Sequence, residues 1–126
     1  MLKIDLSAPE PAYIQIVAQI GLAISKGELS EGDQLPPIRQ LASDLEVNAN
    51  TVAKAYLLLE ENQLIITKGR SGSYINLEAY DYYQDWLKHE VKKELLSSWN
   101  KLLSLSHSRS LSKKIWNDAF KELKDE

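Results

Sequence analysis

Residues 35–56 read LPPIRQLASDLEVNANTVAKAY, and this stretch decides the fold of the chain. Apolar residues recur at the spacing of two helix faces: Ile38, Leu41, Ala42 and Leu45, then Val52, Ala55, Tyr56 and Leu59. The short break between them contains Asn48, a residue type that caps helix starts well. The second helix is expected to run from Ala49 to about Asn62. Two short helices joined by a tight turn predict a helix-turn-helix.

Upstream of this pair, an apolar stripe predicts a scaffold helix from Ala12 to Lys26. Gly27 follows and can close that helix in a left-handed conformation. Residues 2–6 alternate apolar and polar, which predicts a short strand or an extended lead-in. Pro37 is expected in the first turn of the next helix, a position that proline suits.

Downstream of the pair, β-prone runs at 64–67 and 73–76 flank a glycine-rich turn at 68–72 and predict a β-hairpin. A hairpin placed directly after a helix-turn-helix is a wing. Its tip carries Lys68 and Arg70 beside two glycines, so positive charge and close backbone approach coincide. These properties suit contact with a phosphate-lined minor groove; an ordinary solvated turn is the alternative.

The last part of the chain, residues 77–126, predicts two further amphipathic helices around a polar loop at 104–110. Two helices of this size cannot close a core by themselves, and all three tryptophans lie here. A homodimer that buries these faces is the economical interpretation; packing onto the chain's own N-terminal part is the alternative. The residues expected at the dimer contact are Tyr83, Trp86, Leu87, Val91, Leu95, Trp99, Ile115, Trp116 and Phe120.

The composition is that of an ordinary globular protein, with 44% apolar and 26% charged residues. No apolar run reaches the length of a membrane span, about 18 residues, and the first residues lack the apolar core of a secretory signal. The chain has no cysteine, which fits a reducing cytoplasm. The predicted fold is mostly α with a small β-hairpin: a winged helix-turn-helix at 1–76 and a short helical dimerisation domain at 77–126.

The charge balance is unusual for a protein that would bind DNA through its N-terminal part. The net charge is −3, and residues 1–75 hold six Lys and Arg against nine Asp and Glu. Placement matters more than the sum, because screening limits exposed charges to about 10 Å at 0.1 M salt. Most of these acids precede the helix pair, whereas Arg39, Lys54, Lys68 and Arg70 lie in it or just after it. We therefore expect modest DNA affinity for a single copy.

The exposed face of the proposed recognition helix offers polar groups suited to base edges and phosphates. Asn48 and Asn50 can pair with adenine, Thr51 can touch a phosphate or a thymine methyl group, and Lys54 can reach guanine or a phosphate. Arg39 lies near the start of the preceding helix, which crosses the DNA backbone in this motif.

Groups of residues at fixed spacing connect these elements between residues 9 and 76: Tyr13-Ile14-Gln15-Ile16, Gly27-Glu28-Leu29, Gly32-Asp33-Gln34-Leu35-Pro36, Arg39-Gln40-Leu41-Ala42, Val47-Asn48-Ala49-Asn50-Thr51-Val52, Ala55-Tyr56 and Leu59-Glu60. Together they resemble the winged helix-turn-helix of GntR-family bacterial transcription regulators. The short two-helix tail is similar to that of the YtrA subfamily. This resemblance implies dimerisation through the tail, little room for an effector pocket, and repression, often of operons with membrane transporter genes.

The resemblance also implies which residues contact DNA: Arg39, Asn48, Asn50, Thr51, Lys54 and, in the wing, Gly72. The chain departs from the family pattern at four positions: Pro37 replaces a usual serine, Ala53 an arginine used outside the YtrA group, Lys54 a usual arginine, and Gln63 an expected glycine. Lysine keeps the charge of arginine but lacks the planar fork that reads a base with two hydrogen bonds.

Other classes of protein fit the sequence less well. His89 and His107 lie among lysines and serines, and the turn at 69–72 is too short for a phosphate loop, so we expect no enzyme, no cofactor and no metal. The rival interpretation is a winged-helix module that binds protein rather than DNA. The expected function is a cytoplasmic, homodimeric repressor of its own operon, including transporter genes. Its expected partner is an inverted-repeat operator in double-stranded DNA with half-sites about one helical turn apart or somewhat more; no membrane partner is expected, and nothing identifies a small-molecule effector.

Overall fold

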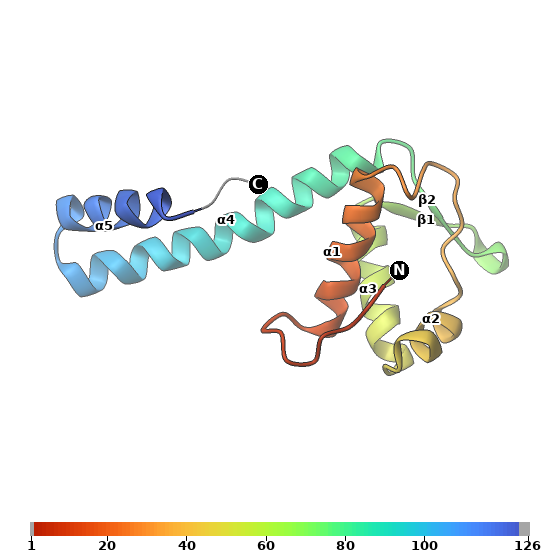
Figure 1. Ribbon diagram of the computed structural model, residues 1–126. Helices are drawn as coiled ribbons and strands as arrows, with labels where there is room; N and C mark the ends of the chain where they lie inside the picture. Colours follow the sequence, from red (N-terminus) through yellow and green to blue (C-terminus); the bar gives the residue numbers. More distant parts are fainter. Residues whose placement is uncertain (1, 124–126) are drawn as a thin grey trace. The chain divides into compact units, whose positions relative to one another are not determined.

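The computed structural model describes residues 2–123, which form five α-helices and one two-stranded antiparallel hairpin (Figure 1). Contacts between residues divide the chain into two compact units, Met1–Trp86 and Leu87–Glu126. Among the residues described, no helix combines the length and the apolar character that a membrane crossing requires. The architecture confirms the mostly helical fold class with its small hairpin.

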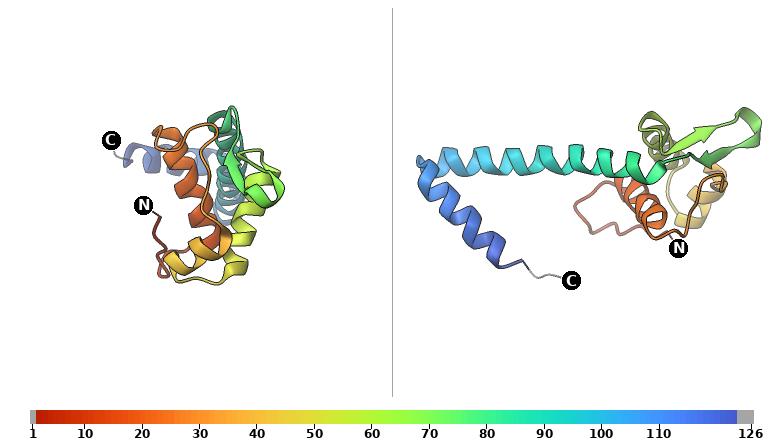
Figure 2. Two further views of the ribbon diagram at one scale, coloured as in Figure 1. Left: turned by 90° about the vertical axis from the view of Figure 1, so that its right-hand side faces the viewer. Right: turned by 90° about the horizontal axis from the view of Figure 1, so that it is seen from above.

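Three helices form the body of the N-terminal unit: α1 (Ala12–Ser25), α2 (Ile38–Leu45) and α3 (Ala49–Glu61). Both α1 and α2 pack against α3, as the two views of Figures 1 and 2 agree. The apolar faces predicted from periodicity supply the core, which is completed by the hairpin: Ile16, Val17, Ile20, Leu41, Ala42, Val52, Ala55, Tyr56, Leu59, Leu64, Ile65 and Ile75. Removing these side chains from water is what holds the short helices in place.

The turn between α2 and α3 is shaped by local backbone chemistry. Glu46 ends α2 in the left-handed region with φ 57°. Asn48 caps α3, because its Oδ1 accepts a hydrogen bond from the backbone N–H of Asn50 at 2.8 Å. Pro37 stands at the cap of α2, with φ −57° and ψ 149°, rather than inside the first turn as expected. A proline there removes no helical hydrogen bond.

Tyr56 ties the two helices of the motif together. Its Oη donates to the carbonyl oxygen of Pro36 at 2.6 Å, and its side chain is buried in the core. Burial raises the pKa of Tyr56 to about 12, since the apolar surroundings disfavour the charged phenolate. The start of α2 and the middle of α3 are therefore joined by a buried hydrogen bond.

The hairpin consists of β1 (Ile65–Thr67) and β2 (Ser73–Ile75), with Ile65 opposite Ile75. The segment 32–35 pairs with this hairpin through backbone hydrogen bonds to β2. Gly32 N–H donates to the Ile75 carbonyl, and Ile75 N–H donates to the Asp33 carbonyl, both at 2.9 Å. The predicted wing is confirmed and is larger than the sequence indicated.

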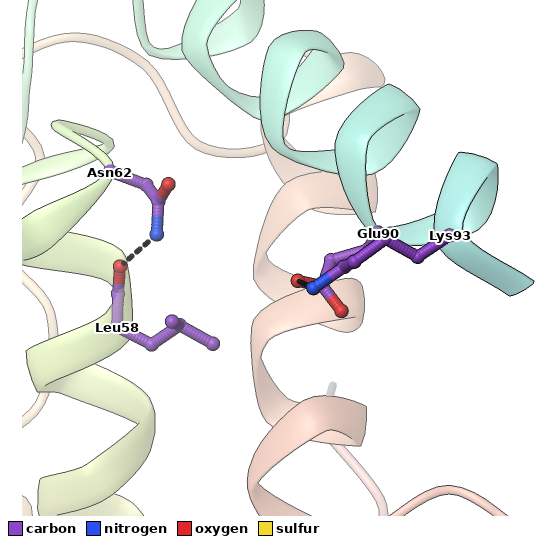
Figure 3. A network of polar contacts seen from close by, with 4 residues as sticks. All are labelled: Leu58, Asn62, Glu90 and Lys93. Carbon is purple, nitrogen blue, oxygen red and sulfur yellow. Dashed lines mark hydrogen bonds and ion pairs between the residues drawn. The ribbon is translucent and has the colours of Figure 1, made fainter.

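The joint between α3 and the hairpin depends on two neighbouring residues. The Leu58 carbonyl accepts twice from Asn62, from its backbone N–H at 3.1 Å and from its side-chain amide at 2.9 Å; Figure 3 shows the side-chain bond. Gln63 follows with φ 66°, the left-handed conformation that glycine adopts most easily and for which the resemblance implied a glycine. The backbone shape at this position is thus kept without the residue that adopts it most easily.

The N-terminal segment is an extended arm and forms no strand within the described residues. Two glutamines one turn apart on α1 hold it by side-chain amides. Gln15 Oε1 accepts from the Asp5 N–H at 2.9 Å, and Gln19 Oε1 accepts from the Lys3 N–H at 2.8 Å. Each amide also donates back to the carbonyl of the same arm residue. The extended lead-in is therefore the correct alternative.

Helix α4 (Ala79–Ser106) begins inside the N-terminal unit. Ala79 and Trp86 are core residues at 4% and 7% exposure, and half-buried Tyr83 packs against that core. We expected Tyr83 and Trp86 at a dimer contact; in the single chain both pack against their own N-terminal unit, Trp86 buried and Tyr83 half-buried. The reason is that α1 offers an apolar face that the first two turns of α4 cover. The compact N-terminal unit therefore includes the first two turns of α4 and extends to Trp86, beyond the predicted boundary after residue 76.

The polar loop expected at 104–110 is wrong in its extent, because α4 continues through Ser106 and α5 (Arg109–Lys121) begins three residues later. Serines close the turn. Ser108 caps α5 by accepting from the Leu111 N–H at 3.0 Å. The hydroxyls of Ser106 and buried Ser112 lie 2.7 Å apart, and His107 takes φ 52°. Polar residues that pair with one another and with helix ends do not require a long loop.

In the C-terminal unit, α4 and α5 diverge from their shared turn (Figure 2). Near the turn, Trp99 and Trp116 meet edge to face, with ring centroids 5.9 Å apart. Two solvent-accessible side chains of α4 form an ion pair, Lys93 to Glu90 at 3.1 Å; Figure 3 draws both residues. The structure does not describe residues 124–126, so the end of the predicted dimerisation domain lies outside the described residues.

Candidate nucleic-acid interface

The start of α3 presents the recognition residues that the sequence predicted. Asn48, Asn50 and Lys54 are exposed, and Thr51 is half-buried. The opposite face of the helix is buried, with Val52 at 0% exposure. The structure therefore brings these polar side chains together on one surface of a helix that the core holds rigidly.

Asn48 has a structural task as well as an exposed position. Its Oδ1 already accepts the backbone N–H of Asn50, and a bidentate pair with adenine needs both the oxygen and the nitrogen of the amide. The group it offers best to DNA is accordingly the Nδ2 donor, which suits a phosphate oxygen. Asn50 is the better candidate for reading a base.

Lys54 lies over an aromatic ring that the sequence analysis placed only in the scaffold. Its Nζ is 4.1 Å from the ring centroid of Tyr13 on α1. An exposed cation–π contact of this kind contributes about 0.5–1 kcal/mol. The contact restricts the flexible lysine side chain, so its charge is held at the side of α3 rather than spread over many rotamers.

Arg39 is exposed in the first turn of α2. No salt bridge of Arg39 occurs among the described residues, where Lys93–Glu90 is the only pair formed. The planar guanidinium of an arginine matches the geometry of a phosphate. This position fits a backbone contact made by the helix that precedes the recognition helix.

The wing tip is ordered by Tyr74, a residue that the sequence analysis did not single out. Tyr74 Oη donates to the Ser71 carbonyl at 2.9 Å and lies 2.8 Å from the Ser71 hydroxyl. Lys68 Nζ stands 5.0 Å from the Tyr74 ring centroid. Exposed Arg70 lies in the same turn, Gly69–Ser71. The two wing cations thus belong to a tip that side-chain contacts hold in shape.

Gly72 is required by both its backbone and its neighbour. Its φ of 113° and ψ of −162° fall in a region open essentially to glycine alone. A Cβ on Gly72 would lie 2.7 Å from Gln34 Nε2, the group that donates to the Ser71 carbonyl at 2.8 Å. Gln34 is a second positioning residue that we missed. The sequence did contain a signal for Gln34, because this residue belongs to the Gly32–Pro36 group that resembles the GntR family.

Most of the residues predicted for the dimer contact lie in the C-terminal unit and keep apolar surface exposed in the single chain. The exposed fractions are 40–48% for Leu87, Val91, Leu95 and Ile115, and 66% for Phe120. Trp99 and Trp116 are half-buried against each other. These side chains leave apolar surface uncovered on both helices of the tail, and contiguous exposed apolar surface commonly marks an interaction site.

Comparison with known proteins decides the family. The model of bacterial regulatory proteins of the gntR family matches residues 12–75, which cover α1 through the wing. The chain belongs to the GntR family. It is a DNA-binding transcriptional regulator with a winged helix-turn-helix, as the exposed face of α3 and the wing predicted.

Individual relatives agree with this assignment to the GntR family. The HTH-type transcriptional repressor YtrA of Bacillus subtilis (strain 168) is 40% identical over 95 residues, 75% of this chain and 73% of its own length. The regulator Rv1152 of Mycobacterium tuberculosis (strain ATCC 25618 / H37Rv) is 40% identical over 75 residues; the match spans 60% of this chain and 62% of that protein. The solved structure of YtrA from Sulfolobus acidocaldarius, described as a GntR-family transcription factor, superposes with a TM-score of 0.61 at 40% identity, over 75% of this chain and 97% of that chain.

Proposed function

We propose that this GntR-family regulator is a homodimeric repressor that binds an inverted-repeat operator in double-stranded DNA. The observation that carries the proposal is the pairing of two features. A polar face at the start of α3 and an ordered basic wing occur in the same compact unit, and the tail leaves apolar side chains exposed. Two-fold symmetry of a dimer requires a two-fold symmetric site on DNA.

Each subunit contributes three kinds of contact to the operator. Asn50 and Thr51 read base edges in the major groove, and Lys54 and the Asn48 amide contact the flanking backbone. Arg39 holds a phosphate where α2 crosses the strand. The wing places the charges of Lys68 and Arg70 along the adjacent minor groove, with Gly72 allowing close approach.

Dimerisation answers the acidic charge of the N-terminal unit. A single winged module that carries excess Asp and Glu gains little from phosphates beyond its local cations. Two modest half-site interactions joined by the tail combine at a high effective concentration and give a much tighter complex. The tail is therefore as necessary to operator binding as the recognition helix.

The regulatory role is proposed by analogy with named relatives. One of them carries the name of a transcriptional repressor, and we extend repression of its own operon, including transporter genes, to this chain. The role places the protein in the cytoplasm, acting by binding and not by catalysis. Genomic footprinting of the protein, with the adjoining genes identified, tests this part and would reject it if no upstream site of its own operon were protected.

The DNA-binding step is tested by the salt dependence of operator affinity, measured on the footprinted inverted repeat. The logarithm of the association constant should fall linearly with log salt, by about 0.9 for each phosphate contacted. Lys54→Ala should weaken binding and reduce this slope by about one per subunit. Lys26→Ala removes an exposed lysine at the end of α1 and should leave affinity and slope unchanged.

Two results would contradict the proposal. Binding that does not weaken between low and moderate salt would remove its electrostatic basis and favour the protein-interaction module. An unchanged slope in Lys54→Ala would remove that lysine from the interface.

A further inference from the structure

Both lysines predicted at the DNA interface lie over a tyrosine ring. Lys54 Nζ is 4.1 Å from the ring centroid of Tyr13, and Lys68 Nζ is 5.0 Å from that of Tyr74. Both distances fall within the range of about 6 Å over which the face of an aromatic ring attracts a cation. Within residues 2–123 these are the two cation–π pairs, so the contact is confined to lysines of the predicted interface.

Lysine and arginine differ in how far they are ordered before they bind. The guanidinium of arginine is a planar, rigid fork, whereas the ammonium of lysine ends a flexible chain of four carbons. Fixing such a chain at the moment of binding costs conformational entropy and weakens the complex. A lysine that already lies over a ring is partly ordered in the free protein. The interface arginines, Arg39 and Arg70, have no such ring among the described residues.

The contact between Tyr13 and Lys54 leaves the positive charge available to a ligand. In the part of the chain that the structure describes, no carboxylate lies within ion-pair distance of Lys54. A carboxylate would neutralise the ammonium and accept from its N–H donors, whereas a ring attracts it through its quadrupole. The ammonium is therefore held in place with its charge intact and with donors available for a phosphate oxygen.

Tyr13 is itself fixed by the body of the N-terminal unit. It lies in the first turn of α1, is half-buried and packs against the hydrophobic core. Helix α1 packs directly on α3, the helix that carries Lys54. The lysine thus contacts a ring that the packed core holds, and not a side chain of a solvated loop.

We propose that Tyr13 is a positioning residue for DNA binding, which holds the Lys54 ammonium where it meets a phosphate oxygen. The inference rests on the proposed operator reader and adds to it a determinant of affinity on the scaffold helix α1. Lys54 makes the contact with DNA, and the ring reduces the entropy lost when that contact forms. Tyr13 therefore affects how tightly the regulator binds and leaves the choice of bases to Asn50 and Thr51.

The first experiment titrates the inverted-repeat operator with full-length protein at several salt concentrations. Tyr13→Leu keeps apolar bulk but removes the ring, so affinity should fall about two- to fivefold for each bound subunit, the loss expected from an exposed cation–π contact. Its salt slope should equal that of the parent, because Lys54 still meets the same phosphate. Lys54→Ala, by contrast, should lower both affinity and slope. Tyr13→Phe keeps the ring and should restore the parent affinity.

The second experiment isolates the electrostatics of the ring. Trifluorophenylalanine at position 13 has nearly the size of phenylalanine, but its fluorine atoms withdraw electron density from the ring face and weaken the attraction for a cation. Affinity should therefore fall from Tyr13→Phe to the fluorinated variant. In the Lys54→Ala background neither Tyr13→Leu nor fluorination should change affinity further, since the double-mutant cycle has already lost the interaction.

Tyr82→Leu is the matched control. Tyr82 is also a half-buried tyrosine packed against the N-terminal core, and it forms no cation–π pair within the described residues. This variant should bind the operator like the parent. Thermal unfolding of every variant identifies any loss of affinity that follows from a loss of fold, and the fluorinated ring still tests the contact if Tyr13→Leu unfolds.

The outcomes separate this inference from the proposed function. Parent affinity in both Tyr13→Leu and the fluorinated variant would overturn the positioning role, and so would an equal loss from Tyr13→Leu in the Lys54→Ala background. A loss in Tyr13→Phe as large as in Tyr13→Leu would assign the effect to the hydroxyl and also overturn it. Each of these results leaves the proposed operator reader intact if Lys54→Ala still lowers affinity and slope. Parent binding by Lys54→Ala would instead refute the proposed contact of Lys54 with DNA, and the role of Tyr13 with it.

Discussion

At the scale of single residues, Tyr56 does more than fill the core position that periodicity assigned to it. Its side chain is 6% exposed, and its Oη holds the Pro36 carbonyl that precedes α2. Removal of this hydroxyl leaves a buried acceptor without its partner, which is the costly way to lose a hydrogen bond. The geometry of the helix-turn-helix thus depends on one phenol.

Tyr56→Phe should lower the free energy of unfolding at neutral pH by about 1–2 kcal/mol. The parent protein has a second signature, because its folded pKa of about 12 lies above the ordinary value of 10.0. A raised folded pKa means that the protonated hydroxyl stabilises the fold fully below pH 10 and that this stability is lost as the pH rises toward 12. Urea unfolding from pH 7 to 11 measures both effects.

The difference between parent and variant isolates Tyr56 from other tyrosines. Tyr82→Phe provides the control, since its hydroxyl makes no hydrogen bond in the part of the chain that the structure describes. Parent and Tyr56→Phe proteins with equal stability at pH 7, or with parallel losses above pH 10, would contradict the assigned role.

Among single residues, prediction from the sequence worked best where a residue interacts with its neighbours in the chain. Asn48 as a cap and Gly27 as a helix end follow from residue type and position alone, and both are confirmed. Lys54 over Tyr13 and Gln34 beneath Gly72 were missed. Each joins residues far apart in the chain, and no local pattern reports such a contact.

At the scale of elements, the wing is a preorganised unit built from three chain segments. Residues 32–35 hydrogen-bond to β2, Gln34 supports the Ser71 carbonyl, and Tyr74 lies under the tip. A loop held in this way loses less conformational entropy when it meets DNA. Its contribution to affinity should therefore depend on residues that never contact a phosphate.

Gly72→Ala tests this dependence. The new Cβ meets Gln34 Nε2 at 2.7 Å in a backbone region closed to alanine, so the Gln34 amide must leave its place under the tip and the backbone at residue 72 is strained. We expect operator affinity to fall about tenfold or more, at a cost of about 1–3 kcal/mol of backbone strain. Gly69→Ala is the matched control: its φ is also positive, at 56°, but its Cβ meets nothing within 4 Å. Electrophoretic mobility shifts and thermal unfolding compare the loss at the crowded, glycine-only position 72 with the loss at the open left-handed position 69.

Equal loss of affinity in the two glycine variants would show that positive φ alone matters and that Gln34 does not position the wing. The elements themselves were predictable, because a helix face or a hairpin repeats its signal over many residues. The polar run at 104–110 misled us, since a serine that pairs with a helix end looks like a loop residue in sequence.

At the scale of the whole molecule, the tail is the part of the single chain whose apolar face is left uncovered. Its apolar stripe along α4 is contributed by Leu87, Val91 and Leu95, each more than one-third exposed. A stable dimer interface typically buries about 1,200–2,000 Å² in total, and this stripe together with the apolar side of α5 is the surface available for it. The proposed dimer and the proposed operator binding should fail together.

Val91→Glu should convert the protein to a monomer and reduce operator affinity by about 100-fold or more, because a buried unpaired carboxylate is strongly unfavourable and linkage between half-sites is lost. Asn100→Glu adds the same charge nine residues later, on the opposite face of a helix with about 3.6 residues per turn, and should remain dimeric. Sedimentation equilibrium and operator titration check both variants.

A monomeric parent protein, or a Val91→Glu protein that stays dimeric, would exclude this stripe as the interface. Sequence reasoning at this scale recognised the apolar stripe and placed Tyr83 and Trp86 at a dimer contact, whereas in the single chain both pack against the N-terminal core. The apolar stripe on α4 first packs against the N-terminal core and then continues as the exposed stripe of the tail. The periodicity of apolar residues does not show where the first of these surfaces ends.

The non-glycine residues in left-handed conformations at the helix ends lower the thermal stability of the chain. Glu46, Gln63, Glu78 and His107 all hold positive φ without being glycine, and each such residue costs about 1–2 kcal/mol. Gln63 holds a φ of 66° in the joint between α3 and the hairpin. A lineage that moved to hotter surroundings could recover part of this energy by single substitutions at these joints, none of which belongs to the surface that reads DNA.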